Sequence, residues 1–548
     1  MRQRVKPGCR LFAVGALLTG LFALGCKNPT SPDPTPVEYP AIQLRQDSLS
    51  LPNGAGEYTF NEAVLVDGDG GYCCENVIFA VENQGQEWLN ISRVVLSSGN
   101  IGDFDLDISG LFNMVAPSSY TNFSLRFDPI VNLGSRSAVV TIISDDQDNG
   151  IYTFKVKGSG MKKCFAGDGA ANFYFGTSGA ISGNTMVVGA YYDYNGAFGE
   201  QGAAYVFERD RPVPDHWGEI RKLVASDGTD WNRFGWSVAI DGDTIVVGAR
   251  GVKNNQGAVY IFYRNHGGAD RWGEVKKLTA GDSSNNDNFG YSVAVSGDTI
   301  VVGANGVDDT FGDQGAAYVY YRNHGGAGNW GEVTRITAGD AALLDGFGCS
   351  VAIAGDIVAV AAAYDDADYN NQGSVYIYDR SHGGTDNWGE VKRITASNAG
   401  EYHLFGLSVA IEGDLLLAGK NDGSAYLFDR NFGGADNWAQ IKELSGSDTV
   451  QYDFFGRSVA ISGDTIAVGA LWDDIDSNRD QGSVYLFYRN AGGAGNWGEV
   501  KKLTAGDGAE NDSFGSFVAV AGNTVVIGAN DDDIGTNGDQ GSAYMFQQ

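Results

Sequence analysis

Residues 289–304 read Phe-Gly-Tyr-Ser-Val-Ala-Val-Ser-Gly-Asp-Thr-Ile-Val-Val-Gly-Ala. Two apolar runs flank a Gly-Asp pair, a pattern typical of a tight β-hairpin turn. Comparable stretches open at each of the seven Phe-Gly pairs, which begin at Phe175, Phe234, Phe289, Phe347, Phe405, Phe455 and Phe514. The pairs are 50 to 59 residues apart. Self-similarity at such a period indicates a repeat architecture.

Each copy predicts four strands, which we call A to D. In the second copy they cover residues 237–240, 244–249, 258–262 and 274–278. Strand B is apolar throughout, as expected for a strand packed on both faces by neighbouring sheets. Seven four-stranded units of this size are typical of the blades of a β-propeller. We therefore predict an all-β chain with a seven-bladed propeller over residues 161–548.

The two ends of this repeat region complement each other. The seventh copy carries strands A to C, but no strand D sequence follows Phe546. Upstream of the first copy, Met161-Lys-Lys-Cys-Phe-Ala-Gly-Asp-Gly169 aligns with Val500-Lys-Lys-Leu-Thr-Ala-Gly-Asp-Gly508. We expect the upstream segment to supply the outer strand of the seventh blade, which would close the ring and shield its edges.

The Phe-Gly and Gly-Ala positions resemble FG-GAP repeats, the units of integrin α-subunit propellers and of many exported bacterial proteins. Blades four and five depart slightly, with Ala361-Ala362 and Gly419-Lys420 in place of Gly-Ala. Many repeats of this kind carry an Asp-x-Asp-x-Asp-Gly calcium loop between strands A and B. Here that connection is only Gly-Asp or Gly-Asn, so the calcium site of the family is not carried over. The resemblance implies the fold rather than a function.

Residues 41–160 alternate short apolar and polar runs between turn residues, which predicts an immunoglobulin-like β-sandwich. The segment resembles bacterial choice-of-anchor D domains, related to the ASPM/SPD-2/Hydin group. This resemblance rests on Glu82-Asn-Gln-Gly85, Phe127-Asp-Pro129 and Gly158-Ser-Gly160. It implies a structural or interaction module without chemistry of its own.

Residues 1–25 have the form of an export signal. Four basic residues precede the uncharged apolar run 11–24, which is too short for a comfortable membrane span. The run ends at Ala-Leu-Gly-Cys26, which resembles a bacterial lipobox, so Cys26 is the expected lipidation site; ordinary secretory cleavage is the alternative. The Pro-rich segment 26–40 is expected to be an extended tether. We therefore expect an outer-membrane lipoprotein of a bacterial envelope, facing the periplasm or the cell surface, or otherwise a secreted protein.

Composition narrows the choice of partners. The 548 residues include 79 Gly, 43 % are hydrophobic, and the net charge is −31. This apolar content excludes general disorder, and the missing Gly-X-Y period excludes collagen. The acidity argues against nucleic-acid partners, and loss of the signal removes four basic residues and no acidic one, which takes the charge to −35. Cys164 and Cys349 are expected to be small buried hydrophobes; the state of Cys73 and Cys74 stays open.

The connections between strands B and C are rich in acid. Grouped carboxylates could form weak, flexible calcium sites, although a solvated acidic rim explains them as well, and no cofactor is required. The candidate metal residues are Asp365, Asp366, Asp368, Asp473, Asp474, Asp476, Asp531, Asp532 and Asp533.

Loops B–C and D–A should emerge on one face of the propeller, and that face gathers aromatic residues that are not part of the repeat. Aromatics with acids and amides on a rigid scaffold suit protein or carbohydrate recognition; alternatively these rings pack their own loops. The candidates are Tyr191, Tyr192, Tyr194, Trp231, Phe311, Tyr364, Tyr369 and Trp472, with Phe198, Tyr402 and Tyr452.

No coherent catalytic set appears in the sequence. A Trp and a Tyr recur in nearly every copy and are expected to be packing residues, and His266, His324 and His382 should be too far apart to share a metal. The leading hypothesis is therefore an adhesion or recognition protein without enzymatic activity. The alternatives are a scaffold within an envelope assembly and, more remotely, a hydrolase acting in the axial mouth of the propeller.

Overall fold

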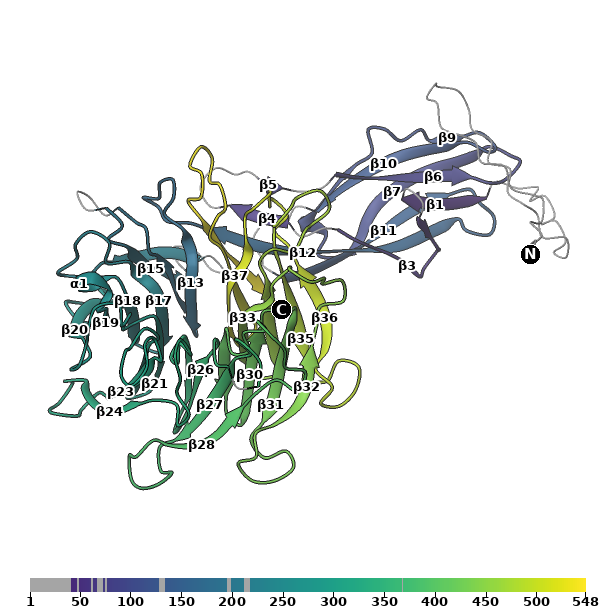
Figure 1. The fold of residues 1–548 in the computed structure, drawn as a ribbon. Helices are drawn as coiled ribbons and strands as arrows, with labels where there is room; N and C mark the ends of the chain where they lie inside the picture. The colour runs from purple at the N-terminus through teal and green to yellow at the C-terminus, as the bar shows by residue number, and fades with distance from the viewer. Residues whose placement is uncertain are drawn as a thin grey trace, which may run out of the picture.

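A computed structural model gives the fold, shown in Figure 1. It describes residues 41–46, 49–60, 63–66, 72–73, 76–127, 134–194, 199–210, 217–366 and 368–548. The predicted export signal, Cys26 and the tether lie outside these residues. No helix within the described ranges has the length and apolar character that a membrane crossing needs.

The N-terminal region is a sandwich of two sheets. One sheet has the order β2-β1-β6-β10-β8 and the other includes β12-β11-β7-β9. Phenylalanines from both sheets meet between them; the rings of Phe79 and Phe123 stack at 5.4 Å, and Phe154 lies 5.2 Å from Phe79. The bounds are β1 Ile42–Gln46, β2 Leu49–Leu51, β3 Gly56–Thr59, β4 Ala63–Val66, β5 Tyr72–Cys73, β6 Asn76–Asn83, β7 Leu89–Gly99, β8 Phe104–Asp107, β9 Met114–Val115, β10 Tyr120–Phe127, β11 Gly134–Ser144 and β12 Ile151–Cys164.

Strand β12 belongs to both regions. Its first part pairs with β11 in the sandwich, and its last four residues pair antiparallel with β39 of the propeller. Strand β4 lies parallel to the same end of β12, with Gly160 opposite Ala63. The sandwich and the propeller therefore share a continuous strand, and the sequence boundary drawn at residue 160 falls inside it.

The remaining strands form seven four-stranded blades around one axis (Figure 1). From the inside outward, the blades are β13 Phe175–Ser182, β14 Thr185–Ala190, β15 Ala203–Arg209, β16 Trp217–Leu223; β17 Phe234–Asp241, β18 Thr244–Ala249, β19 Ala258–Tyr263, β20 Gly273–Leu278; β21 Ser292–Ser296, β22 Thr299–Ala304, β23 Ala316–Tyr321, β24 Gly331–Ile336; β25 Ser350–Ala354, β26 Ile357–Ala362, β27 Ser374–Asp379, β28 Gly389–Ile394; β29 Val409–Glu412, β30 Leu415–Lys420, β31 Ser424–Asp429, β32 Ala439–Leu444; β33 Phe455–Ser462, β34 Thr465–Ala470, β35 Ser483–Tyr488, β36 Gly498–Leu503; and β37 Phe514–Ala521, β38 Thr524–Ala529, β39 Ser542–Gln547 with the end of β12. The prediction of an all-β, seven-bladed propeller is confirmed.

The Phe-Gly pair holds each blade to its neighbour. Phe234 is fully buried and packs edge-on against Tyr260 of strand C, with ring centroids 5.5 Å apart. Gly235 has a φ of +87°, and a Cβ at this position would lie 2.2 Å from the carbonyl oxygen of Ala203 in the previous blade. Only glycine fits both constraints, which explains why this pair marks every repeat.

The ring closes as predicted. Lys163 of β12 lies opposite Tyr544, as Lys502 lies opposite Tyr485 in the sixth blade. In addition, the Ser516 hydroxyl of the seventh blade donates to the Gly176 carbonyl of the first at 2.8 Å. Closure pairs the strand edges that an open array would leave exposed.

Candidate ligand-binding face

Loops B–C and D–A form one face of the propeller, which we call the loop face, and hydrogen bonds join them across blades. The backbone N–H groups of Trp231, Arg233 and Phe234 donate to the carbonyls of Gly199, Glu200 and Gln201 of the preceding blade. The same three-bond pattern recurs where D–A loops follow the second, third, fourth, sixth and seventh blades. The loop face is therefore held as a rigid surface.

The first aspartate of several B–C loops lies inside the protein. Asp473 is 4 % exposed and accepts hydrogen bonds from the Tyr485 hydroxyl, at 3.0 Å, and from Ser483. Lys502 of strand D lies 2.8 Å from Asp473 and 2.8 Å from Asp448 of the D–A loop. Burial would lower the pKa of Lys502, but its hydrogen bonds to both carboxylates outweigh burial and raise that pKa.

This arrangement, which we call the Tyr–Asp–Lys cluster, recurs around the ring. Each cluster joins the hydroxyl of a strand C tyrosine, one or two carboxylates and a strand D cation. The members with a buried B–C aspartate are Tyr205, Asp168, Asp193, Lys222; Tyr376, Asp340, Asp365, Arg393; Tyr485, Asp448, Asp473, Lys502; and Tyr544, Asp507, Asp532, Lys163. The strand C tyrosines are packing residues, as expected, and their hydroxyls also hold the acidic loops.

The fifth blade has the charges in exchanged places. Strand D carries Glu443 where the sixth blade carries Lys502, and the cation comes instead from Lys420 at the end of strand B. Lys420 is fully buried, and its ammonium lies 2.8 Å from Asp422 and 2.8 Å from the side-chain oxygen of Asn398. The Tyr426 hydroxyl donates to Glu443 at 3.0 Å. The departure at Gly419-Lys420 therefore preserves the cluster with its charges exchanged.

The other candidate metal residues lie on the outside of these loops. Asp366, Asp474 and Asp533 each accept a backbone N–H of their own loop, from Asn371, Asp480 and Asp539. Asp368 and Asp476 are exposed, and Asp531 accepts a hydrogen bond from Asn530. Across the described ranges, no three His, Cys, Asp or Glu residues are gathered so that they could hold a metal ion. Calcium binding by these loops stays a prediction.

Most of the predicted aromatic residues are exposed on the loop face. Trp472 nevertheless packs on Phe454, with centroids 4.2 Å apart, and Tyr191 and Tyr192 are half-buried against each other at 4.4 Å. Phe198 lies outside the described residues. The freely exposed rings are Tyr194, Trp231, Phe311, Tyr364, Tyr369, Tyr402 and Tyr452.

Three of these exposed rings occupy one strained repeat position. The third residue before each Phe-Gly pair has a positive φ; it is Asn in blades one, three and seven. Asparagine tolerates this left-handed conformation, whereas bulky side chains rarely adopt it. Here Trp231, Tyr402 and Tyr452 adopt it at φ values of 64°, 61° and 84°. Leu344 holds the same position in the fourth blade, at a φ of 68°. The three exposed rings held in this conformation are therefore candidates for a functional role.

The axial channel is lined by residues that the sequence reasoning did not single out. Its volume is about 320 Å³, and the first residues of the seven inner strands line it, including Trp236, Tyr291 and Arg457. These three residues share the position directly after Phe-Gly, which also holds Thr177, Cys349, Leu407 and Ser516. Variation at a position beside an otherwise fixed pair was the signal that could have found them. The prediction that Cys349 is a buried small hydrophobe is also corrected: its position faces the axis, and the side chain is partly exposed to the channel.

Two aspartates have a pKa in the range of a general acid, but their carboxyl groups are buried out of reach of a substrate. Burial raises the pKa of Asp512 to about 7 and that of Asp345 to about 6. Each carboxylate accepts a backbone N–H of its own D–A loop, from Ala509 and Ala342. Both are almost fully buried, so these shifts belong to loop structure rather than to a catalytic pair.

The family model for the FG-GAP repeat matches the chain seven times, at residues 159–207, 217–262, 272–320, 330–378, 388–428, 438–487 and 497–546. The chain belongs to the FG-GAP repeat family. Each matched segment begins in or next to strand D and ends in strand C, so the family unit spans two structural blades. FG-GAP propellers are generally binding or recognition folds.

Two further comparisons add little to this FG-GAP assignment. A computationally designed protein, Ika8, is similar over 70 % of this chain and 98 % of its own, at 13 % identity and a TM-score of 0.38. No curated protein matches the sequence. The assignment therefore depends on the seven family matches alone.

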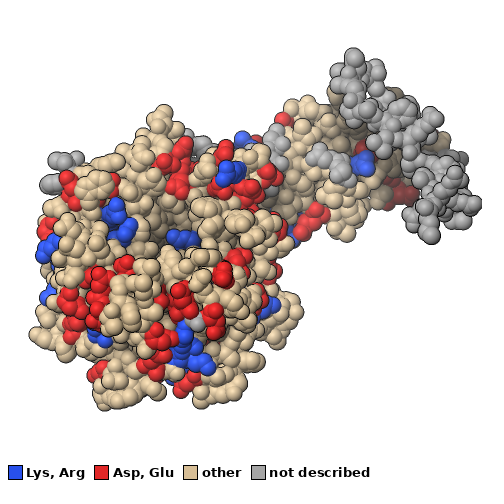
Figure 2. All heavy atoms as spheres, viewed as in Figure 1, with Lys and Arg blue, Asp and Glu red and all other residues tan. Residues whose placement is uncertain are grey.

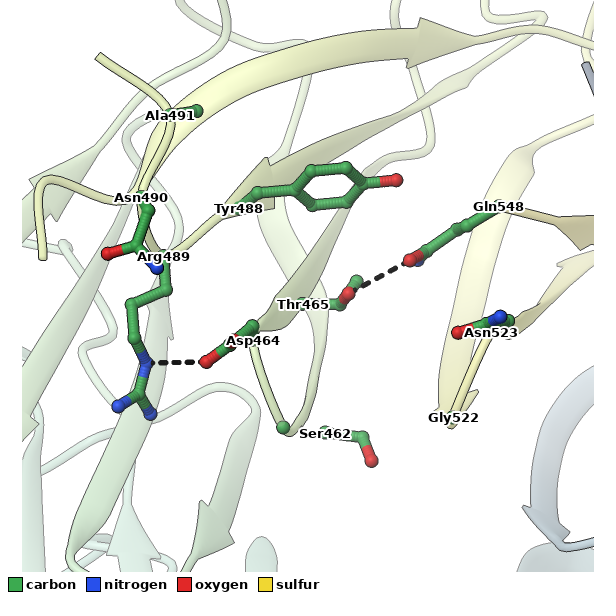
Figure 3. Close-up of a pocket in the computed structure, with 11 residues that line it drawn as sticks. Ser462, Asp464, Thr465, Tyr488, Arg489, Asn490, Ala491, Gly522, Asn523 and Gln548 are labelled. Carbon is green, nitrogen blue, oxygen red and sulfur yellow. Dashed lines mark hydrogen bonds and ion pairs between the residues drawn. The ribbon is translucent and has the colours of Figure 1, made fainter. Parts of the chain in front are cut away.

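A cavity of about 590 Å³ lies on the opposite face of this FG-GAP propeller, between the sixth and seventh blades (Figure 3). In the second and third blades an arginine follows strand C, and Arg264 and Arg322 donate across the gap to Thr185 and Thr244 of the preceding blade. Between the sixth and seventh blades, Gln548 occupies that place and accepts from Thr465 at 3.0 Å (Figure 3). A smaller cavity of about 380 Å³ lies at the equivalent place beside Thr244 and Arg322, so the feature recurs with the repeat.

Proposed function

We propose that this protein is an exported, lipid-anchored recognition protein of a bacterial cell envelope, whose loop face binds a macromolecule, most readily a glycan. The observation that carries this proposal is the set of exposed aromatic rings, Trp231, Tyr402 and Tyr452, held at positive φ on a rigid surface. Folding alone would favour asparagine at these positions. Flat apolar rings on a fixed scaffold are suited to packing against the faces of sugar rings or protein side chains.

Array binding tests the recognition part of the proposal. The mature protein should bind members of a glycan or matrix-protein array, and changing Trp231, Tyr402 and Tyr452 together to Asn should abolish that binding. Phe432 is equally exposed, at 57 %, but lies in a C–D connection on the opposite face, so Phe432→Asn is the matched control. Unchanged binding by the triple variant would overturn the loop face as the binding surface.

The anchoring part of the proposal depends on Cys26 and the Pro-rich segment after it. Labelling with a fatty-acid probe in a bacterial host should mark the wild-type protein and should fail for Cys26→Ser. The wild type should also fractionate with membranes, and Cys26→Ser should be released. Equal fractionation of the two proteins without label would contradict lipid anchoring and favour plain secretion.

A further inference from the structure

The loop-face end of the axial channel is bordered by a continuous group of aromatic rings, which together with three arginines we call the axial mouth. Tyr174 lies 5.8 Å from Tyr191, Tyr191 lies 5.0 Å from Trp236, and Trp236 lies 5.7 Å from Tyr291. All four rings are partly exposed. They come from the first three blades and form one side of the opening.

The arginines of the axial mouth are Arg233, Arg250 and Arg457. The guanidinium of Arg250 stacks on Trp236 at 3.7 Å and lies 5.7 Å from the ring of Tyr291. Arg233 lies 5.9 Å from the ring of Tyr192. Arg457 enters from the sixth blade, on the far side of the channel from the third-blade residue Tyr291, and lines the channel.

These cations lack the partners that arginines have elsewhere in this propeller. In the part of the chain that the structure describes, no carboxylate forms an ion pair with any of the three, and the buried Nε atoms of Arg233 and Arg250 have no hydrogen-bond acceptor. By contrast, several other arginines form ion pairs with acids, for example Arg322 with Asp298 at 2.7 Å, Arg393 with Asp340 at 2.7 Å and Arg489 with Asp464 at 2.9 Å. The Nε atoms of Arg322 and Arg489 also lack a well-aligned acceptor, so what sets the arginines of the axial mouth apart is the missing ion pair. Arg233 acts electrostatically on Glu200, where it opposes the rise in pKa that burial causes, but no ion pair joins the two described side chains.

This arrangement is costly for the folded protein. Burial, together with the neighbouring Arg233, lowers the pKa of Arg250. A buried donor without an acceptor is destabilising, although the chain is rich in acid, with 68 Asp and Glu against 37 Lys and Arg, and red side chains outnumber blue ones on the face shown in Figure 2. If Arg250 only packed against Trp236, an apolar side chain in its place would avoid the cost of burying a charge.

We propose that the axial mouth is a binding site for a carboxylate, carried by an acidic sugar unit of the glycan that the loop face binds. The planar guanidinium fork of Arg250 matches the two oxygens of a carboxylate, and the surrounding rings offer flat surfaces for the sugar. With a net charge of −31, the protein repels densely charged polyanions. A glycan whose acidic units are separated by neutral ones avoids most of that repulsion. This inference rests on the proposed function, since it specifies the ligand of the same face.

The test compares two matched probes, an oligosaccharide bearing one glucuronic acid and the same oligosaccharide with its carboxyl group reduced to an alcohol. Titration calorimetry should show that the wild-type protein binds the acidic form about tenfold more tightly or better, as expected for hydrogen bonds to charged groups. Arg250→Met should lose this preference and bind the two probes with equal affinity. Arg250→Met without ligand should unfold no earlier than the wild type, because it removes a buried charge that has no partner.

Arg479→Gln is the control, because Arg479 is exposed in a B–C loop of the same face, outside the axial mouth, and carries the same charge. Equal affinity of the wild type for both probes, or an equal effect of Arg479→Gln and Arg250→Met, would overturn the carboxylate site and leave the recognition function intact. Binding of acidic peptides but of neither sugar probe, with dependence on Arg250, would overturn the glycan as the ligand. Binding of nothing by the wild type on any array would overturn the proposed function itself.

Discussion

The Tyr–Asp–Lys clusters and the axial mouth lie on the same face, but they treat charge in opposite ways. In each cluster the protein supplies both signs, so that Asp473 and Asp448 meet Lys502 at 2.8 Å. In the axial mouth it supplies aromatic rings and guanidinium groups without a carboxylate to match. The charges of each cluster are therefore neutralised within the protein, whereas the hydrogen-bond donors of the axial mouth are available to a ligand. The buried aspartates of the acidic loops have partners within the fold, and under the proposed function the cations near the axis are the candidates for contact with a ligand.

The fifth blade offers the strongest test of the structural role of the clusters, because its cluster depends on one fully buried cation. Lys420→Met would remove the ammonium group that lies 2.8 Å from Asp422, and removing one partner of a buried charge group destabilises by about 3–5 kcal/mol. Denaturant unfolding should show a loss of this size. Lys442, which is only partly buried and bonds to an amide, is the control, and Lys442→Met should change stability by less than about 0.5 kcal/mol.

Adding Glu443→Lys to Lys420→Met should restore much of the lost stability, because it returns the cation to strand D, where the sixth blade has Lys502. A double variant no more stable than Lys420→Met would contradict the exchange of charges between the two blades.

Removing a cluster carboxylate should have the next largest effect. Asp473→Asn keeps one acceptor for Tyr485 but leaves Lys502 with a single carboxylate, so a loss of about 2–3 kcal/mol is expected. The unfolding midpoint should be measured with and without calcium. If Asp473 is a structural acid, the loss is the same in both conditions; a calcium-dependent stabilisation of the wild type that Asp473→Asn abolishes would instead establish the predicted metal site.

The sequence was sufficient for the fold but not for the roles of the loop acids. Phe234, Gly235 and their six equivalents repeat because the pair makes the same close contact with the preceding blade, so periodicity alone gives the blade number. The partners of Asp473 come from strands C and D, and no local pattern joins them. A comparison across copies could have revealed the link, because blade five, which has Glu443 at the strand D cation position, is also the blade with Lys420.

The axial mouth was harder to predict for a related reason. Trp236, Arg250 and Arg457 come from different repeats or from different loops, and each is unremarkable in its own segment. Only closure of the ring brings the first residue after each Phe-Gly pair to a common axis. A variable position inside a strict repeat is therefore the place to look for ligand contacts in such a chain.

The pH dependence of stability provides a smaller test within the D–A loops. The pKa of Asp512 is about 7, mainly because the carboxyl is buried, with Asp532 and Asp507 adding to the rise and Lys163 and the Ala509 N–H opposing it. Because the folded pKa lies above the unfolded value, the folded state holds an extra proton between about pH 4 and 7. Asp512 therefore makes the protein lose stability as pH rises through that window. Asp512→Asn should remove this loss and be more stable than the wild type at pH 8; an unchanged pH profile would contradict the shift.

The smallest expected effect is that of Trp231→Asn, which should increase stability but decrease affinity for the glycan. Trp231 holds a left-handed backbone, which costs a bulky residue about 1 kcal/mol that asparagine largely avoids. Trp231→Asn should therefore raise the unfolding midpoint slightly while weakening glycan binding. Asn286→Trp, the reverse change at the equivalent position of the third blade, should lower the midpoint without adding affinity unless a new contact forms. A residue kept only for packing would lose stability when changed to Asn. A gain in stability coupled to a loss of binding would show that the ring is held against the preference of its own backbone, as the unpaired Arg250 is held against the preference for a partner.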